Sequence, residues 1–332
     1  MAVTAIVNPL PVDSGRLRPF DVRRDLKPVA DLVELCFRDT LDQNGQRYLK
    51  QMRDAARHGG LLSWAGGFAE QASLPMTGFV WEEDGRVVGN LTLIPLHHEG
   101  RRIYLIANVA VHPDYRRRGI ARALTLAGVD HARSHRAASV WLHVRQDNEV
   151  AVQLYQSLGF IERAVRTTWR SRQDGSALFS ETGKVAPAYA IGPRQRVHWP
   201  QQHAWLERLY PPELAWHFPL KIHALRADLS GSIYRLLVGA SARHWVAQRE
   251  KHLAGVLTWQ SFHTSADVLW LATPPEAEDE AIYQLLRCAR RGLSPRRPLA
   301  LDFPAGLGSE AIRRAGFHAQ TTLVWMENPI SR

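Results

Sequence analysis

Apolar residues recur at helical spacing near the start of the chain. Between Lys27 and Thr40, one helix face would carry Val29, Leu32, Val33, Cys36 and Phe37. The alternating pattern of Leu17–Val22, just before this stretch, predicts a strand. The chain therefore opens with a strand followed by an amphipathic helix.

Short runs rich in β-branched and aromatic residues then predict a series of strands. The expected strands are Thr77–Trp81, Val87–Leu93, Ile103–Val111, Val140–Val144 and Ile161–Trp169. The first two flank Glu82-Glu83-Asp84-Gly85, whose Asp-Gly pair favours the positive φ of a tight hairpin turn.

Two further helices are expected between these strands. One begins near Gly119, and the other runs over Asn148–Leu158 and ends before Gly159, a residue type common just beyond a helix end. This mixture of strands and helices predicts an α/β (α+β) fold.

Composition divides the chain into an arm, two domains and a linker. The arm is 1–16, the first domain 17–171, the linker 172–196 and the second domain 197–328. The second half faintly repeats the first: Gly85–Leu93 resembles Lys251–Trp259, and Leu158–Phe160 resembles Ala315–Phe317. We therefore expect an internal duplication.

Bulk composition narrows the classes of function. No apolar run approaches the ~20 residues that a membrane span needs, and Met1–Ser14 lacks the features of a signal peptide. The only cysteines, Cys36 and Cys288, lie in different halves. A disulfide framework is therefore not expected, and a reducing cytoplasm fits the chain.

The formal net charge of +10 could attract nucleic acid or a phosphate-rich cofactor. Its basic residues are scattered, and no zinc-finger spacing or RNA-binding aromatic motif is present. Nucleic acid is therefore not expected as a partner. His131 and His135 share a helix face without a third ligand, so we interpret them as solvated and expect no metal.

The clearest chemistry lies in Arg116-Arg117-Arg118-Gly119-Ile120-Ala121, between an expected strand and an expected helix. The first N–H groups of a helix lack internal partners and lie at the positive end of its dipole, so they can bind a pyrophosphate. Gly119 and Ala121 would let the backbone approach the phosphates closely. The sequence has neither the Gly-x-Gly-x-x-Gly of dinucleotide-binding folds nor the Gly-Lys-Ser/Thr of P-loops.

The segment Val109–Leu124 resembles motif A of the Gcn5-related N-acetyltransferase (GNAT) superfamily, with its Arg/Gln-x-x-Gly-x-Gly/Ala core. Trp141–Asn148 and Ala151–Phe160 follow in order and resemble motif B. The resemblance covers roughly 17–171. It implies two GNAT-like domains, each a mixed, mostly antiparallel twisted sheet flanked by helices, with both motifs intact only in the N-terminal half.

The resemblance also implies which residues hold acetyl-CoA. The strand at Val109–Val111 would splay from Val140–Val144 and leave a slot for the pantetheine arm. Backbone groups of Val109, Ala110 and Val111 would pair with that arm, and Asn148 would contact the cofactor. The pyrophosphate would be held by Arg116, Arg117, Arg118, Gly119, Ile120, Ala121 and Arg122.

Tyr155 matches the family tyrosine that protonates the departing thiolate, and a phenol is a competent donor at neutral pH. The base is open, because family members often use a glutamate on the strand Ile103–Val111, which contains no acid here. His143 matches a catalytic histidine of some N-terminal acetyltransferases, and imidazole has a suitable reference pKa of ~6.5. Asn108 could instead orient a water, and His97 and His98, near the hairpin that should flank the acceptor site, are weaker candidates. Purely structural roles for Tyr155 and His143 are the competing interpretations.

The second half lacks this equipment. Glu276-Ala277-Glu278-Asp279-Glu280 lies where the pyrophosphate loop would be, and its carboxylates would repel a polyphosphate. Counting from the Gly-Phe pair, Ile312 replaces Tyr155 and Ala305 replaces Asn148. We expect a degenerate second domain and one active site, in a chain whose halves could mimic a dimer within a monomer.

The predicted function is acetyl transfer from acetyl-CoA to a primary amine, on a small molecule, a protein N-terminus or a lysine, in a ternary complex. Another acyl-CoA or an aminoglycoside-like acceptor is compatible with the same fold. The alternative of a different class is a non-catalytic acyl-CoA-binding or nucleic-acid-associated module. The loops that choose an acceptor vary freely among related folds, so the sequence leaves the acceptor open.

Overall fold

The computed structural model describes residues 16–41, 43–57, 77–171, 189–226, 242–261, 266–293 and 297–330. Nearly all of the expected arm and most of the expected linker lie outside these residues. The chain divides into two compact units. Unit 1 comprises Met1–Val144, Asn148–Arg163 and Trp325–Arg332, and unit 2 comprises Arg145–Asp147 and Ala164–Val324.

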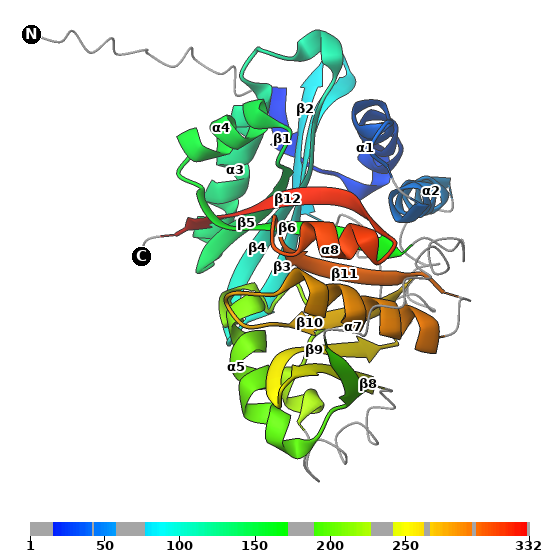
Figure 1. The fold of residues 1–332 in the computed structure, drawn as a ribbon. Helices are drawn as coiled ribbons and strands as arrows, with labels where there is room; N and C mark the ends of the chain where they lie inside the picture. Colours follow the sequence, from blue (N-terminus) through cyan, green and yellow to red (C-terminus); the bar gives the residue numbers. More distant parts are fainter. Residues whose placement is uncertain are drawn as a thin grey trace, which may run out of the picture. The chain divides into compact units, whose positions relative to one another are not determined.

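Unit 1 is built on strands in the order β1-β2-β3-β4-β5, all antiparallel except for the parallel pair β4–β5. Helices α1 and α2 lie on one face of this sheet, and α3 and α4 lie on the other (Figure 1). The elements are β1 (Leu17–Pro19), α1 (Val22–Phe37), α2 (Gln43–Arg57), β2 (Thr77–Glu83), β3 (Arg86–His98), β4 (Arg101–Val111), η2 (Pro113–Tyr115), α3 (Ile120–Ser134), β5 (Ser139–Arg145) and α4 (Glu149–Ser157).

Unit 2 repeats this topology with strands in the order β7-β8-β9-β10-β11-β6, again antiparallel except for one parallel pair, β10–β11. Both sheets are mixed and mostly antiparallel, which confirms the expected fold class. The elements that follow α4 along the chain are β6 (Ile161–Ser171), β7 (Ala190–Pro193), η4 (Arg196–His198), α5 (Trp199–Leu209), η5 (Pro212–Leu214), η6 (Ile222–Leu225), β8 (Ala242–Arg249), β9 (His252–Gln260), β10 (Asp267–Ala272), α7 (Asp279–Gly292), β11 (Leu299–Pro304), α8 (Ser309–Arg314) and β12 (Phe317–Pro329). The start of β6 and the end of β12 belong to unit 1.

Each unit takes in a piece of strand from the opposite half of the chain. In unit 2, β6 pairs with β11, so that Trp169 lies opposite Leu301. In unit 1, the residues after Val324 join the sheet, and the N–H of Ile330 donates to the carbonyl of Ala138 at 3.1 Å. The predicted domain ranges 17–171 and 197–328 follow the order of the chain, whereas the compact units do not.

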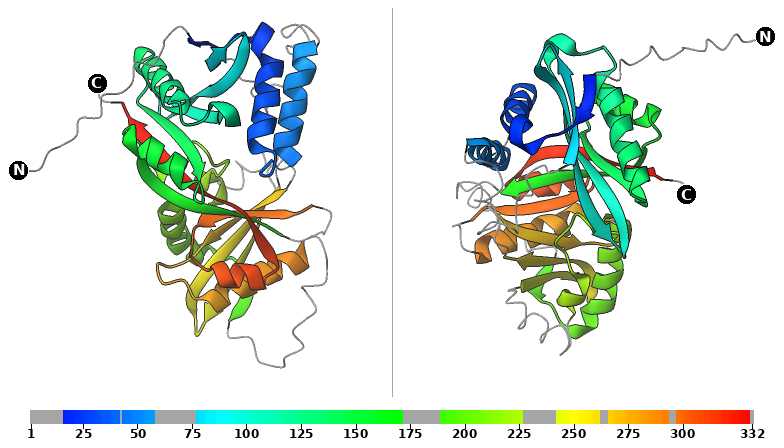
Figure 2. Two further views of the ribbon diagram at one scale, coloured as in Figure 1. Left: turned by 90° about the horizontal axis from the view of Figure 1, so that it is seen from above. Right: turned by 180° about the vertical axis from the view of Figure 1, so that it is seen from behind.

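One apolar core of unit 1 lies between the sheet and the pair α1 and α2, which lie side by side (Figure 2). Its buried members include Val29, Leu49, Met52, Val80 and Ala110. In unit 2, the helix α7 buries residues spaced three and four apart against β8 and β9. Among the described residues, no helix is both long and apolar enough to cross a membrane.

The first helix begins earlier than the sequence pattern predicts. The expected strand Leu17–Val22 ends at Pro19, and α1 runs from Val22 instead of Lys27. The Asp21 side chain accepts a hydrogen bond from the backbone N–H of Arg23 at 2.9 Å and so caps the new start. This local cap extends the helix by more than a turn ahead of its apolar face.

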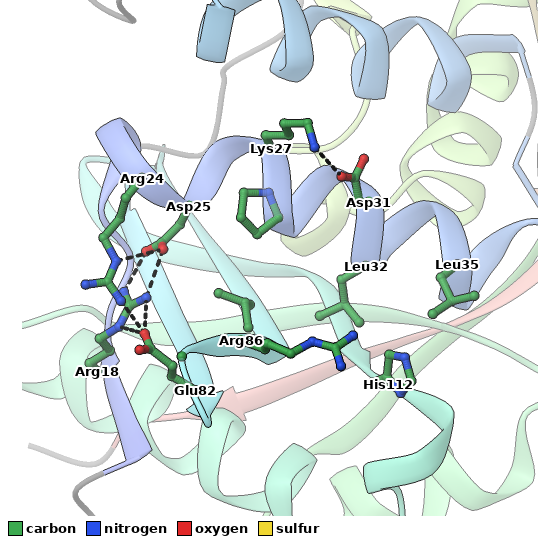
Figure 3. Close-up of a pocket in the computed structure, with 13 residues that line it drawn as sticks. Arg18, Arg24, Asp25, Lys27, Asp31, Leu32, Leu35, Glu82, Arg86 and His112 are labelled. Atoms are coloured by element: carbon green, nitrogen blue, oxygen red, sulfur yellow. Dashed lines mark hydrogen bonds and ion pairs between the residues drawn. The ribbon is translucent and has the colours of Figure 1, made fainter.

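A buried carboxylate anchors the start of α1 to the sheet. Arg18 of β1 donates two hydrogen bonds to Asp25, at 2.6 and 2.8 Å, and the backbone N–H of Asp21 donates a third at 2.8 Å. Figure 3 shows Arg24 and Glu82 completing this charged cluster. Burial alone would raise the pKa of Asp25, but the hydrogen bonds and the Arg18 charge outweigh it and hold the pKa below its usual value.

We expect Asp25→Asn to lower the free energy of unfolding at pH 7 by about 2 kcal/mol, because it leaves the half-buried Arg18 charge without its main partner. The folded pKa of Asp25 is depressed, so its contribution is present above the unfolded pKa of about 3.9 and is lost as pH falls through the folded value. Urea unfolding at pH 7 and near pH 2.5 measures the difference in the free energy of unfolding between variant and wild type. We expect this difference to be smaller in acid.

Asp31→Asn is the matched control, because Asp31 lies on the same helix but its side chain is 47% exposed. Its ion pairs with Lys27 and Arg53 are solvated, and we expect a change below about 0.5 kcal/mol. Equal losses in the two variants would contradict a special role for the buried carboxylate.

Candidate functional site

Strand β4 contains a bulge in its second half. Asn90 of β3 lies opposite Ala110, but Thr92 lies opposite Ala107, so Asn108 and Val109 together face a single residue of β3. Asn108 adopts a left-handed conformation with φ 52°. The Asn90 side chain fixes it by donating a 2.9 Å hydrogen bond to the Asn108 carbonyl.

The bulge marks the point where β4 leaves β5. The two parallel strands pair only over Ile103–Ile106 and Ser139–Leu142. The register does not continue to Val109–Val111 on β4 or to His143 on β5. Beyond the bulge, β4 therefore keeps its pairing with β3 but, among the residues that the structure describes, has no pairing with β5 on its other edge.

The loop after β4 leads into an uncapped helix start. Arg117 and Gly119 both have positive φ, at 66° and 78°, and Gly119 is the residue from which α3 begins. No side chain caps this end, whereas Asp21 caps α1 and Asn148 caps α4. A Cβ built on Gly119 would meet nothing within 4 Å. The first turn of α3 thus has no side-chain cap and open space beside Gly119, as an anion site requires.

The arginines around this helix start are exposed but mostly tethered. Arg116 donates to the carbonyl of Val111 at 3.2 Å, and Arg122 donates to the Ser157 hydroxyl at 3.1 Å. Arg118 lies over the ring of Tyr115, 4.9 Å from its centre. These contacts hold positive charge beside the helix start. Ile120 is buried beneath it, while Ala121 is partly exposed.

The carbonyl of Val111 is already in use. It accepts hydrogen bonds from the Cys36 thiol at 3.3 Å and from the Arg116 guanidinium at 3.2 Å. The Ala110 side chain, by contrast, is buried in the α1–α2 core. A cofactor arm that paired with Val111 would therefore share its carbonyl with two protein donors.

Tyr155 lies on α4 with only 7% of its surface exposed, and its ring packs edge-on against Phe160. Burial raises the pKa of Tyr155 to about 12, so the phenol keeps its proton across the physiological range. At the start of the same helix, the Asn148 side-chain oxygen accepts the backbone N–H of Ala151 at 3.2 Å. Asn148 therefore serves as a helix cap, whatever else it contacts.

His143 lies on β5 just beyond the last residue paired with β4. It is half-buried, and its ring packs on that of Trp325 with the ring centres 4.3 Å apart. Trp325 comes from the C-terminal end of β12 and belongs to unit 1. The local sequence around His143 gives no signal of this contact.

Tyr48 contacts the candidate site residue Asn108 and was not predicted from the sequence. It lies on α2, and its hydroxyl oxygen accepts a 3.3 Å hydrogen bond from the Asn108 side chain at the bulge. Burial raises the pKa of Tyr48 to about 12, although the bond from Asn108 acts in the opposite direction. The spacing of Tyr48, Leu49 and Met52, apolar at one-, three- and four-residue intervals, is the helical signal that could have found it.

Unit 2 places carboxylates where unit 1 places its arginine loop. Helix α7 begins after Glu278 with Asp279 and Glu280 in its first turn, and Glu278 pairs with Arg249 at 3.2 Å. The position of Tyr155 is taken by the buried Ile312. The sequence comparison puts Ala305 at the position of the helix cap Asn148. In the structure, however, α8 is a shorter helix that begins after Gly308 and not after Ala305.

A hollow of about 540 Å³ lies apart from these residues, between α1 and the β2–β3 hairpin (Figure 3). Its lining is Arg18, Arg24, Asp25, Lys27, Pro28, Asp31, Leu32, Leu35, Glu82, Gly85, Arg86, Val87 and His112. None of the predicted site residues lines it, and most of its charges pair with one another. We do not take it as the candidate site.

The histidines of α3 are not simply solvated, contrary to the sequence interpretation. His131 and His135 stack with ring centres 4.0 Å apart, and Tyr104 packs edge-on against both. Burial is the main reason why the pKa of His131 is lowered. Within the described part of the chain, no three His, Cys, Asp or Glu side chains gather as a metal site would require.

In a comparison with known proteins, residues 33–160 match the family model described as "Acetyltransferase (GNAT) family". The chain is 43% identical over 68 residues to the ribosomal protein bS18-alanine N-acetyltransferase of Escherichia coli K12, which covers 20% of this chain and 46% of that protein. It is 31% identical over 177 residues to the mycothiol acetyltransferase of Thermobispora bispora, covering 50% and 54%.

The chain spans about half the length of the curated relatives it matches. Among solved structures, the GCN5-related N-acetyltransferase from Sphaerobacter thermophilus aligns with 96% of both chains, at 15% identity and a TM-score of 0.51. At that identity the likeness concerns the fold alone.

Proposed function

Since residues 33–160 belong to the acetyltransferase (GNAT) family, we propose that the chain transfers an acetyl group from acetyl-CoA to a primary amine. The observation that carries this proposal is the uncapped start of α3 at Gly119, open to solvent and flanked by tethered arginines. Free helix N–H groups and nearby guanidinium groups are the donors that a diphosphate needs. The separated ends of β4 and β5 lie beside it.

In this proposal, the cofactor lies along β4 with its diphosphate on Arg116–Arg122. Backbone groups of Val109 would pair with the pantetheine arm, and Ala110 and Val111 lie on the same part of β4, beyond its pairing with β5. An N–H group of this stretch would polarise the thioester carbonyl, as an oxyanion-binding donor does. Asn148 contributes from the start of α4.

The reaction is a direct attack. The amine nitrogen bonds to the carbonyl carbon, the bond from carbon to sulfur breaks, one proton leaves the nitrogen and one proton reaches the sulfur. Tyr155 donates the proton to the sulfur, because burial keeps its hydroxyl protonated at neutral pH. A phenol of raised pKa is easily reprotonated from solvent after each turnover.

His143 is the proposed acceptor of the nitrogen's proton, directly or through a water. We expect His143→Asn to remove the acidic limb of the pH–rate profile, because that limb reports protonation of the base. The profile of kcat/KM from pH 5.5 to 9 measures this. His97→Asn, an exposed histidine on the β3–β4 hairpin, should leave the limb in place. An unaltered limb in His143→Asn would assign the base elsewhere and leave Asn108 as the group that orients a water.

The acceptor is tested with a panel of amines. One relative is named for a ribosomal-protein alanine, so the panel contains a peptide with an N-terminal alanine. A blocked peptide with one lysine and an amino sugar represent the other acceptor classes compatible with the fold. Release of free CoA thiol with each amine is the readout. Thiol release that depends on an amine supports the proposal.

Thermal unfolding separates the enzyme from the alternative functions. Stabilisation by CoA without thiol release for any amine would overturn the enzyme and favour a non-catalytic acyl-CoA-binding module. Salt-sensitive stabilisation by duplex DNA alone would favour the nucleic-acid module that the charge of +10 permits.

A further inference from the structure

A small polar cluster interrupts the apolar face that α1 and α2 cover. It comprises Asn90 and Thr92 of β3, Asn108 of β4 and Tyr48 of α2. Asn90 and Thr92 are only 1% and 2% exposed. Polar side chains this deeply buried are rare unless they bind one another or a ligand.

Strand alternation places the two β3 side chains on the side of α1 and α2. Leu91 and Leu93 approach the position of a Cβ on Gly128 of α3, at 3.2 and 3.5 Å. Those leucines therefore face α3. Asn90 and Thr92 point the opposite way, because successive side chains of a strand alternate between its faces.

Two hydroxyl groups of this cluster retain unused hydrogen-bonding capacity. Asn108 donates one hydrogen bond to the Tyr48 oxygen, which leaves that oxygen able to accept a second. The Thr92 hydroxyl is buried and has no hydrogen-bond partner among the residues that the structure describes. An unsatisfied buried hydroxyl destabilises the folded protein, so a polar ligand or a water is expected beside it.

We propose that Tyr48, held in place by Asn108, positions the acceptor amine at the bulge of β4 together with the Thr92 hydroxyl. This inference rests on the proposed acetyl transfer and assigns the amine to the α2 side of the sheet. The bulge lies where β4 leaves β5, which is the part of the strand that borders the proposed cofactor slot. The two hydroxyl oxygens accept N–H bonds from the amine and turn its lone pair toward the thioester.

Neither hydroxyl takes the amine's proton. Burial raises the pKa of Tyr48 to about 12, so its hydroxyl is neither ionised nor a base at neutral pH, and a threonine hydroxyl does not titrate. Tyr48 and Thr92 are therefore positioning residues. Their loss should weaken capture of the amine without moving the pH–rate profile.

The test varies both substrates in steady-state kinetics, with the N-terminal alanine peptide or whichever amine of the panel the wild type acetylates fastest. We expect Tyr48→Phe, which removes only the hydroxyl, to raise the KM for the amine about tenfold while the KM for acetyl-CoA stays within about twofold. Tyr104→Phe, a buried phenol on the same sheet, is the matched control and should change neither constant.

Thr92→Val separates a ligand contact from a structural role. If the hydroxyl has no partner other than the amine, the valine variant unfolds at an equal or higher temperature, because an unsatisfied buried group has been removed. Its KM for the amine should nevertheless rise. A stabilised variant with an unchanged KM would overturn the assignment of Thr92.

For Tyr48, a parallel rise in the KM for acetyl-CoA would mean that the hydroxyl only holds the bulge in shape, and unchanged constants would mean that it has no role. Either result overturns the inference. Failure of the proposed function is seen separately, in a wild-type protein that releases no thiol with any amine. The double variant Tyr48→Phe/Asn108→Ala should have a KM for the amine no higher than that of the more impaired single variant, because the two side chains act as one unit.

Discussion

Replacing Gly119 by glutamate should weaken acetyl-CoA binding by at least about a hundredfold, since the new carboxylate would lie at the helix start that is proposed to hold the diphosphate. Two physical effects act together. The position has φ 78°, which disfavours any side chain, and the space before it is open, so the carboxylate can occupy the place of the phosphates. Each effect alone would be tolerated better than both.

Isothermal titration with CoA measures this effect directly. Gly100→Glu is the matched control, because Gly100 in the β3–β4 hairpin has φ 74° and equally open surroundings. It carries the same strain and the same charge in the same unit, but at the opposite end of β4. Equal weakening in both variants would point to general destabilisation, and normal binding by Gly119→Glu would remove the proposed diphosphate site.

Tyr155→Phe should lower kcat by on the order of a hundredfold or more, the size of effect typical for loss of a general acid. The KM for acetyl-CoA should stay nearly unchanged, because the ring and its packing against Phe160 remain. Rapid-quench measurement of the chemical step, or thiol release under saturating conditions, gives the comparison. An unchanged kcat would reduce Tyr155 to a core aromatic residue.

The sign of the pH dependence provides a second check on Tyr155. Burial disfavours the phenolate and raises the pKa to about 12. The donor form therefore persists as pH rises and is lost only as pH passes that value. Between pH 8 and 10, deprotonation of Tyr155 should therefore not lower the transfer rate of the wild type. The pH–rate profiles of the wild type and of Tyr155→Phe should have the same shape in this range.

Sequence patterns predict most of the elements near the site, because their causes are local. The Asp84-Gly85 turn has the positive φ angles that an Asp-Gly hairpin favours, at 49° and 72°. Gly119 and Gly159 likewise adopt the left-handed conformation at a helix start and just after a helix end. These features depend on a few neighbouring residues and need no knowledge of the rest of the chain.

Other features depend on contacts between distant residues. The partner of Asn108 is Tyr48, sixty positions away, and Trp325 reaches His143 from the far end of the chain. A local pattern can indicate that a residue is polar or apolar, but it cannot indicate what it will touch. Helix α2 is a different case, because its apolar spacing is a local signal that the sequence itself contains.

The inclusion of Trp325–Arg332 in unit 1 bears on how the protein is made. About 180 residues separate Val144 from Trp325, which a ribosome takes roughly 9 to 36 seconds to add at ~5–20 residues per second. During that interval the nascent N-terminal unit lacks its closing strand, and the ring of His143 lacks its cover. Emergence of Trp325–Pro329 from the exit tunnel, rather than completion of the first half, would then set the moment at which this unit finishes folding.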